Sequence, residues 1–297
     1  MDYRTDLNNL IEIEKLPQKY HQLTQAVWLP LAQQLLSLSQ ASSLPFIVGI
    51  NGAQGSGKST LAKCLKLLLE NMNQRVIILS IDDFYLTKQA RLDLSHKKHP
   101  LFKVRGVPGT HNIKLLSDVI KQLKMANKNS LIRYPIFYKQ FDDVADEAHW
   151  NSYIGKPDLI ILEGWCVGIK AQTENQLISP INDLEKNNDP DGSWRKQINE
   201  SLKLYYRPIF KQIDYLIYLA PPSFNSVFNW RKEQEEKLIL KIQDDKKMAE
   251  TMDQQQIYAF IAYFQRLTEH AMLTLNKRAH CVIPLDDERN VRQVINN

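Results

Sequence analysis

The sequence predicts an α/β fold in which a mainly parallel sheet is covered by helices on both faces. Short apolar runs, each long enough for one buried strand, alternate along the chain with stretches of helical periodicity. The clearest of these runs are continuously apolar, which is typical of parallel strands buried on both faces. The first run is followed by a glycine-rich loop and then by a helical pattern, so that strand, loop and helix stand in direct succession.

The predicted elements follow one another along the chain. Strands are expected at the apolar runs, residues 46–50, 75–81, 157–162, 215–219 and 280–284. Helices are expected at residues 18–40, from Ser59 onward, and at 113–125, 228–247 and 254–275. Residues 88–112 are polar and basic and are predicted to form an irregular region over a site. Residues 171–195 are polar, with a strong turn signal at 187–192.

The composition is that of a globular protein with a full core. Of the 297 residues, 43% are hydrophobic and 24% are charged. The net charge of +5 suits anionic ligands but is too weak to indicate nucleic acid. The three cysteines are far apart and are expected to be buried thiols in a reducing compartment. No signal peptide is recognised and no apolar stretch approaches the roughly 18 residues of a membrane span, so we expect a cytoplasmic protein with no membrane partner.

Residues 52–59 read Gly-Ala-Gln-Gly-Ser-Gly-Lys-Ser, the G-x-x-x-x-G-K-S pattern of a phosphate-binding loop, or P-loop. Its glycines allow a tight turn with inward N–H groups, and the helix that follows adds a partial positive charge. Lys58 is expected to reach the β- and γ-phosphates of a nucleoside triphosphate, and the Ser59 hydroxyl to bind Mg²⁺. The predicted nucleotide-binding residues are Gly52, Ala53, Gln54, Gly55, Ser56, Gly57, Lys58, Ser59 and Thr60.

Two carboxylates follow predicted strands at the ends where open parallel sheets bind ligands. Asp82 comes directly after the second strand and is predicted to accept the proton of an acceptor hydroxyl, with Asp83 as the alternative. Glu163 follows the third strand and is predicted to hold the metal, directly or through water. The alternative for Glu163 is a carboxylate at a helix start.

Two further clusters carry arginines. Arg105 opens Arg-Gly-Val-Pro-Gly-Thr-His111 and could clamp a carboxylate or phosphate, the alternative being a solvated surface loop. Arg231 lies near the start of a charged helix that could act as a mobile lid and bring it to the phosphates. The alternative is a solvated helix with ion pairs between residues four positions apart.

The P-loop alone does not distinguish kinases from other users of nucleoside triphosphates. No N-K-x-D reader of guanine and no L-S-G-G-Q transporter signature occurs in the sequence. Basic residues do not interleave with aromatic ones, as a groove for single-stranded nucleic acid would require. With Asp82 after the second strand, these absences favour a small-molecule kinase.

The stretch Ser80-Ile-Asp-Asp-Phe-Tyr85 resembles a strand end in uridine kinase, phosphoribulokinase and pantothenate kinase. The closer resemblance is to the D-glycerate 3-kinase family. Its matching stretches are residues 49–60, 82–87, 105–111, 162–168, 189–192, 222–234 and 265–270. They extend over nearly the whole chain, and their combination is specific.

The resemblance implies a P-loop NTPase fold of three α/β/α layers with a mainly parallel sheet and a helical lid. It implies ATP and Mg²⁺ as cofactors, and transfer of the γ-phosphoryl group to the 3-hydroxyl of D-glycerate. It supports Lys58, Asp82 and Arg231 as catalytic residues, with Ser59 and Glu163 at the metal. The predicted substrate-binding residues are Asp83, Tyr85, Arg105 and His111.

Two positions depart from the family pattern. Tyr138 stands where the family has Asp, and Val144 where it has Arg. The alternatives for the acceptor are therefore a nucleoside, pantothenate or a sugar phosphate. A nucleotide-binding regulator with little turnover is an alternative of another class.

The organisation expected from these motifs is one kinase domain over residues 1–297. Residues 1–44 are expected to form an N-terminal helical extension. Residues 88–112 and 133–155 are expected around the acceptor, and residues 225–247 are expected to form the lid. The expected partner is a small hydroxy acid, with no nucleic-acid partner.

Overall fold

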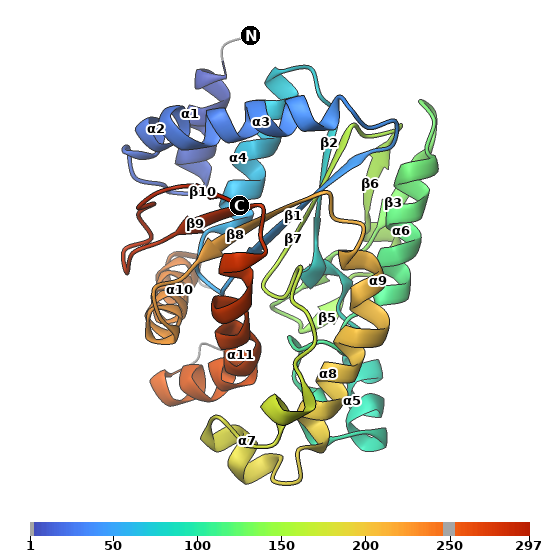
Figure 1. Ribbon diagram of the computed structural model, residues 1–297, viewed down its shortest axis with the longest axis vertical. Helices are drawn as coiled ribbons and strands as arrows, with labels where there is room; N and C mark the ends of the chain where they lie inside the picture. Colours follow the sequence, from blue (N-terminus) through green and yellow to red (C-terminus); the bar gives the residue numbers. More distant parts are fainter. Residues whose placement is uncertain (1–2, 246–252) are drawn as a thin grey trace.

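A central six-stranded sheet forms the middle of the molecule in the computed structural model (Figure 1). The structure describes residues 3–245 and 253–297, and for residues 237–245 it describes the backbone only. Its strand order is β10-β9-β8-β1-β7-β2, and only the edge pair β10–β9 is antiparallel. The strands are β1 (Phe46–Gly52), β2 (Val76–Ser80), β7 (Leu159–Gly164), β8 (Tyr215–Ala220), β9 (Cys281–Pro284) and β10 (Ile295–Asn296). All five predicted strands are thus confirmed, and β10 is an addition.

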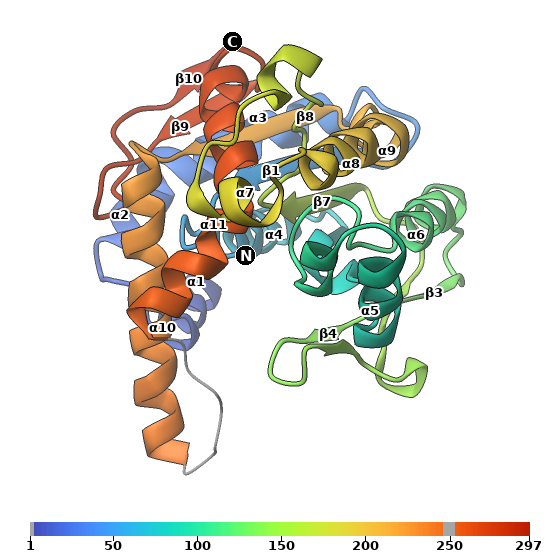
Figure 2. The same ribbon diagram turned by 90° about the horizontal axis from the view of Figure 1, so that it is seen from below.

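Helices cover both faces of the sheet, as predicted (Figures 1 and 2). One face is covered by α1 (Arg4–Ile13), α2 (Tyr20–Leu23), α3 (Leu29–Ser39), α4 (Lys58–Asn71) and the start of α10 (Phe224–Asp245). The other is covered by α6 (Ile113–Met125), α8 (Ser193–Ser201), α9 (Arg207–Phe210) and α11 (Gln254–Thr274). Because successive strand side chains point to opposite faces, Ile47 of β1 joins one core and Val48 the other. The three-layer α/β/α fold is confirmed.

The helix predicted over 18–40 is a succession of α2, a π-helical turn (Thr24–Trp28) and α3. A second π-helical turn (Leu202–Tyr206) joins α8 to α9. The helix α1 lies within residues 1–44, which were expected to be a helical extension, although no separate helix was predicted there. No helix in the described part of the chain has the length and apolarity to cross a membrane, and the three cysteines are buried free thiols, as predicted.

The prediction that residues 88–112 are irregular is wrong in its first half, which forms α5 (Lys88–Lys97). The side chain of Thr87 caps this helix by accepting a hydrogen bond from the Ala90 amide. The helix buries only Arg91 and Ser95, so it has no apolar stripe that periodicity could reveal. The polar stretch 171–195 likewise contains α7 (Asp183–Asn188) and the start of α8.

Two small antiparallel sheets flank the site. One pairs β3 (Leu131–Tyr134) with β6 (Asn151–Ile154). The other is the hairpin of β4 (Phe137–Tyr138) and β5 (Asp143–Val144), whose turn carries residues 139–142.

Candidate active site

The glycine loop joins the end of β1 to the start of α4, as the motif predicts. Gly55 and Gly57 adopt φ of 76° and 87°, the left-handed region that favours glycine. A Cβ atom at Gly55 would lie 2.6 Å from the Cβ of Trp230, so the loop packs directly against α10. The start of α4 therefore presents Lys58 and Ser59 at the carboxyl end of the central strand.

Glu163 lies where a metal would be held. In the sheet it is paired with Ile50 on one side and Ser80 on the other, which places it between the P-loop strand and the strand that ends before Asp82. The Ser59 hydroxyl donates a 2.8 Å hydrogen bond to its Oε1. Its Oε2 is buried and has no hydrogen-bond partner in the described structure. Such an orphaned carboxylate oxygen beside a hydroxyl fits a Mg²⁺ site.

No group of three or more His, Cys, Asp or Glu that could hold a metal occurs in the described ranges. The usual Mg²⁺ site of phosphoryl-transfer proteins has only one or two protein ligands, and phosphates and water complete it. A Ser59–Glu163 pair is of that kind.

Asp82 and Asp83 lie in a 3₁₀ turn (Ile81–Phe84) at the carboxyl end of β2. The Tyr85 hydroxyl donates to Asp82 Oδ1 at 3.0 Å, and Lys139 Nζ lies 3.3 Å from its Oδ2. Burial would raise the pKa of Asp82, but the charges of Lys139 and Lys58 outweigh it and lower the pKa to about 2. Asp82 is therefore a carboxylate at neutral pH, near the P-loop lysine.

Asp83 has the opposite electrostatics. Burial raises the pKa of Asp83 to about 6, the Phe137 amide opposes the rise by donating to Oδ1 at 3.3 Å, and the charge of Asp82 adds to it. The two neighbouring carboxyl groups thus have widely separated pKa values, and Asp83 gains its charge near pH 6.

Tyr85, His111 and Tyr206 form an aromatic layer behind Asp82. The rings of Tyr85 and His111 stack at 4.4 Å. His111 Nδ1 lies 2.6 Å from the Tyr206 hydroxyl oxygen, which itself accepts the Gly109 amide at 2.9 Å. Because that oxygen accepts from Gly109, its proton is free to be donated to His111 Nδ1.

With the Tyr206 hydroxyl as the donor, this contact sets the tautomer of His111. Burial lowers the pKa of His111 to about 4, so the ring is neutral at pH 7. A neutral ring that accepts at Nδ1 carries its proton on Nε2. His111 Nε2 is buried and lacks a partner in the described structure. In that tautomer, Nε2 is a hydrogen-bond donor without a partner in the described structure.

Tyr206 was missed by sequence reasoning. It is almost fully buried and ends the π-helical turn between α8 and α9. Such turns often occur at functional sites, but neither the turn nor the contact with His111, 95 positions away, leaves a periodic signal in the chain.

Replacing Tyr206 by phenylalanine is expected to raise the KM for the acceptor about tenfold and leave the KM for ATP unchanged. The variant removes the donor that fixes the His111 tautomer and leaves buried polar groups unpaired, which costs about 1–3 kcal/mol. Steady-state kinetics with each substrate varied in turn measure this. The control is Tyr205→Phe at the exposed neighbour; equal changes in both KM values would contradict the role of Tyr206.

Arg105 is not free in this structure. Its guanidinium is paired with Asp142 in the turn of the β4–β5 hairpin, and Arg91 Nη2 lies 2.6 Å from the other Asp142 oxygen. Both guanidinium groups lie over the Phe137 ring, at 5.4 and 5.7 Å. Arg105 therefore does hold a carboxylate, but one from the chain itself. Lys139 and Asp142, which close the hairpin over the site, were not among the predicted site residues.

Arg231 is held within its own helix. Its Nη2 lies 2.7 Å from Glu235, and its guanidinium lies over the Phe260 ring at 5.6 Å. The neighbouring Trp230 is fully buried and donates its indole N–H to the Asp287 carbonyl at 2.6 Å. The start of α10 is thus anchored beside the P-loop. The end of the predicted lid, residues 246–247, lies outside the described residues.

The structure brings most predicted site residues together at the carboxyl ends of β1, β2 and β7. A strand, a P-loop and a helix, with the acid Glu163 at the end of the neighbouring strand β7, define a P-loop nucleotide-binding protein. Residues 30–97 match a family model described as the KAP family P-loop domain. The chain is 32% identical over 259 residues to "Uncharacterized kinase mug58" of Schizosaccharomyces pombe, covering 82% of this chain and 89% of that protein.

The chain therefore belongs to the family of ATP-dependent P-loop kinases that contains this yeast protein, and D-glycerate 3-kinase is among its homologues. It is 31% identical over 201 residues to the chloroplastic D-glycerate 3-kinase of Arabidopsis thaliana, which is 64% of this chain and 41% of that enzyme. The solved structure of D-glycerate 3-kinase from Cryptococcus neoformans superposes with a TM-score of 0.73 at 21% identity, over 91% of this chain and 97% of that one. That superposition shows the shared fold.

Proposed function

We propose that this kinase phosphorylates a small hydroxy acid and that its acceptor is D-glycerate, giving 3-phosphoglycerate. The observation that carries the proposal is the convergence of a P-loop lysine, the Ser59–Glu163 pair and an ionised Asp82 on one edge of the sheet. The likeness to the plant D-glycerate 3-kinase supports the choice of acceptor. We also propose that residues 1–297 form one kinase domain.

The nucleotide would lie on the P-loop, with its β- and γ-phosphates on the loop amides and Lys58. Ser59 and Glu163 would hold Mg²⁺, which would neutralise charge that develops during transfer. Asp82 would accept the proton of the acceptor hydroxyl as its oxygen bonds to the γ-phosphorus and ADP departs. Lys139, 3.3 Å from Asp82, adds a cation on the side of the hairpin.

The acceptor would lie between the hairpin and the aromatic layer, as proposed for residues 88–112 and 133–155. Arg105 offers a cation for the acceptor's carboxylate, which would displace Asp142 from the guanidinium. His111 Nε2 offers a neutral donor, and Asp83 and Tyr85 line the same space. These groups favour a carboxylate-bearing acceptor over a neutral nucleoside.

Arg231 is proposed to act on the phosphates if α10 moves as a lid. In the structure Glu235 and Phe260 hold its guanidinium. Because Trp230 and Val227 anchor the first turns of the helix, such a movement would have to release Arg231 from Glu235 without unpacking those turns.

The acceptor is tested with purified protein, ATP and Mg²⁺ against D-glycerate, L-glycerate, pantothenate, uridine and a pentose phosphate. D-Glycerate is expected to raise ADP release more than any other acceptor, with ³¹P NMR locating the product phosphate on the 3-hydroxyl. A larger response to another acceptor would refute the glycerate assignment and leave the kinase class intact. ATP binding without transfer to any acceptor would favour a nucleotide-binding regulator.

A further inference from the structure

A large basic groove lies on the sheet face that is covered by α8, α9 and α11, and no proposed catalytic residue lines it. Its volume is about 1240 Å³. It is lined by the segment that follows β7, by the continuous helix of α8, the π-helical turn and α9, by the chain that leads into β8, and by residues before β9. The P-loop contributes no lining residue.

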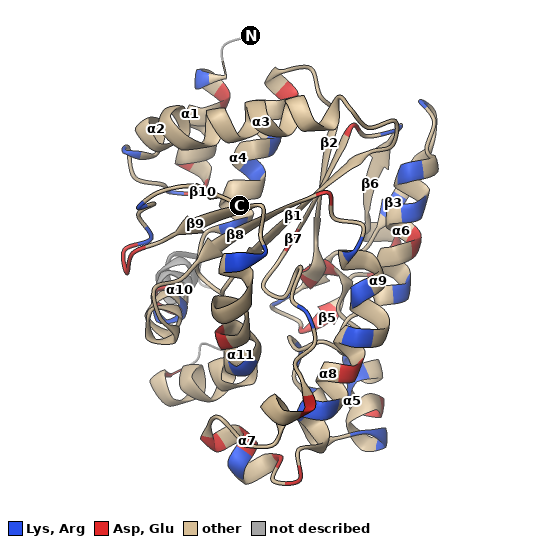
Figure 3. Cartoon of the chain, viewed as in Figure 1, with Lys and Arg blue, Asp and Glu red and all other residues tan. Residues whose placement is uncertain are grey.

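The groove concentrates most of the chain's excess positive charge. Its basic residues are Lys170, Lys196, Lys203, Arg207, Lys211 and Arg278, and its acidic residues are Glu174 and Glu200. This is an excess of four positive charges, against +5 for the whole chain. Figure 3 shows Lys and Arg following one another along α8 and α9.

These cations have few partners in the structure. The ammonium group of Lys196 lies 3.4 Å from the Asp191 carbonyl oxygen. The other five basic side chains have no hydrogen bond or ion pair among the described residues. By contrast, the buried Arg91, Arg195 and Arg266 are each paired with a carboxylate. Although Glu174 and Glu200 also line the groove, none of its cations is paired with a carboxylate among the described residues.

The spacing of three of these cations places like charges close to one another on the exposed side of the groove. Lys203, Arg207 and Lys211 lie four positions apart along one helical stretch, so like charges are neighbours on one face. Lys170 and Arg278 line the same hollow from other segments. Partial burial lowers the pKa of Arg278. A concave site lined by one sign of charge focuses its field on a ligand of the opposite sign.

The floor of the groove is apolar. Ile169, Leu177 and Leu216 are buried, and Phe210 is half-buried beside them. A bare inorganic anion would use the cations and leave this floor unused. A ligand that matches the whole lining has an anionic group at one end and an apolar body at the other.

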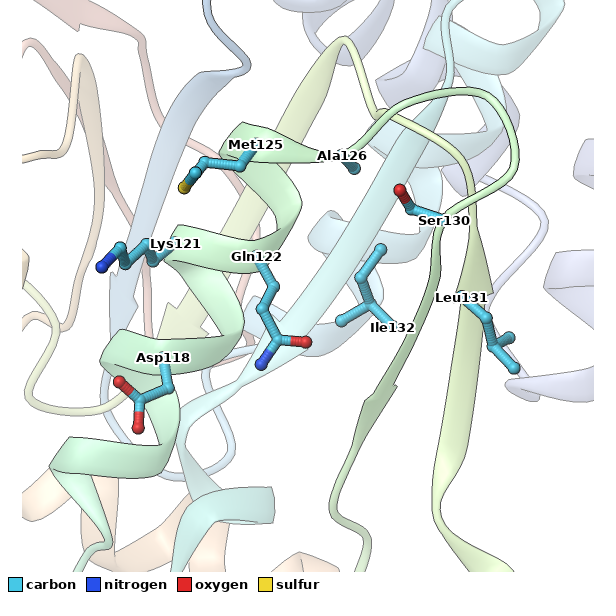
Figure 4. Close-up of a pocket in the computed structure, with 8 residues that line it drawn as sticks. All are labelled: Asp118, Lys121, Gln122, Met125, Ala126, Ser130, Leu131 and Ile132. Atoms are coloured by element: carbon cyan, nitrogen blue, oxygen red, sulfur yellow. The ribbon is translucent and has the colours of Figure 1, made fainter.

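A second hollow, beside α6 and β3, shows what an ordinary surface depression looks like (Figure 4). It has a volume of about 610 Å³, and its only charged lining residues are Asp118 and Lys121. Its charges balance, so size alone does not make the groove a candidate.

We propose that the basic groove binds an organic phosphate, separately from the nucleotide on the P-loop. The phosphate group lies on Lys203, Arg207 and Lys211, and the apolar body of the ligand packs on Phe210 and Leu216. A small ligand is favoured over an acidic protein because the cations line a hollow of ligand size instead of a flat face.

The test uses 1-naphthyl phosphate, a fluorescent phosphate ester, with the P-loop kept occupied by a non-hydrolysable ATP analogue and Mg²⁺. Saturable binding of one probe per chain is expected, and it should weaken as ionic strength rises. The variant Lys203→Gln/Arg207→Gln should weaken the probe at least about tenfold and retain binding of the ATP analogue. Retained analogue binding also shows that the variant is folded.

Two matched variants complete the experiment. Lys121→Gln/Lys128→Gln removes the same charge from exposed positions outside the groove and should leave probe affinity unchanged. Lys203→Arg/Arg207→Lys keeps the charge and should retain affinity. The proposal would be overturned if the probe shows no saturable binding while the P-loop is occupied. It would also be overturned if Lys121→Gln/Lys128→Gln weakens the probe as much as Lys203→Gln/Arg207→Gln does. If a poly-glutamate peptide binds more tightly than the probe and displaces it, the ligand of the groove is an acidic protein and the proposal of an organic phosphate is wrong.

Discussion

The replacement Lys58→Ala is expected to lower kcat for phosphoryl transfer by about 10²–10³-fold. Lys58 is the first residue of α4, and its side chain stands where the loop would hold the β- and γ-phosphates. Removing a fixed charge from the transferred group loses stabilisation that water in a closed site does not replace. The measurement is ADP release at saturating ATP with the best acceptor of the panel.

The control for Lys58→Ala is Lys66→Ala on the same helix. Lys66 is partly exposed and pairs with Glu70 at 3.6 Å, an arrangement that contributes little to stability. This variant should keep the native rate. A Lys58→Ala protein with kcat within about threefold of native, well short of the loss expected for a transition-state charge, would mean that the transferred phosphate does not lie on this loop.

Local patterns were enough to predict most of the fold. The strand at 75–81 was recognised because continuous apolar residues followed by two aspartates are characteristic of a buried strand that ends at a site. The helix Ile113–Met125 was predicted to the residue, and in the structure Leu116, Val119, Ile120 and Leu123 form its buried stripe. The P-loop needed no tertiary information, since its turn, charge and helix start are contiguous in sequence.

The parts that were missed depend on contacts between distant segments. Asp142 lies 37 positions beyond Arg105, and only the fold places the two together. The helix α5 was missed because its buried residues are polar. The choice between Asp82 and Asp83 could not be made from sequence because both follow the same strand. Burial raises the pKa of both, and they differ because Lys139 and Lys58 lower the pKa of Asp82, whereas the charge of Asp82 raises that of Asp83.

The second large effect concerns that choice. Asp82→Asn is expected to lower kcat by about 10²–10⁴-fold and leave the affinity for ATP unchanged. The amide can still accept the Tyr85 hydroxyl, but it cannot take a proton from the acceptor. Rapid-quench transfer and equilibrium binding of the ATP analogue measure the two quantities separately. Asp83→Asn is the matched variant, with the same chemical change one residue away.

The pH profile separates the two carboxylates independently of the size of the rate loss. The pKa of Asp82 is lowered to about 2, so its carboxylate is present throughout pH 5–8 and it adds no acid limb there. The pKa of Asp83 is raised to about 6, so a reaction that needs its charge loses rate as pH falls through 6. With Asp82 as base, native enzyme and Asp83→Asn should therefore show the same dependence of kcat/KM on pH across that window. Two results together would identify Asp83 as the base instead. The native enzyme would show a loss of rate below about pH 6 that Asp83→Asn abolishes, and Asp82→Asn would keep a near-native rate.

The stability of the same variants gives a readout that is independent of turnover. A carboxyl whose folded pKa is raised costs stability progressively as pH rises from its unfolded pKa, about 4, to its folded pKa, so the cost of ionising Asp83 is complete above about pH 6. Asp83→Asn removes this cost and should raise Tm at pH 8 relative to the native protein, with a smaller gain at pH 5.

Asp82 has a lowered pKa, so its charge stabilises the fold above its unfolded pKa, and that contribution is lost only as pH falls toward 2. Asp82→Asn should therefore lower Tm at both pH values. At pH 8, a higher Tm for Asp83→Asn and a lower Tm for Asp82→Asn would support these opposite electrostatic environments. A lower Tm for both variants would show that the charge of Asp83 stabilises the fold.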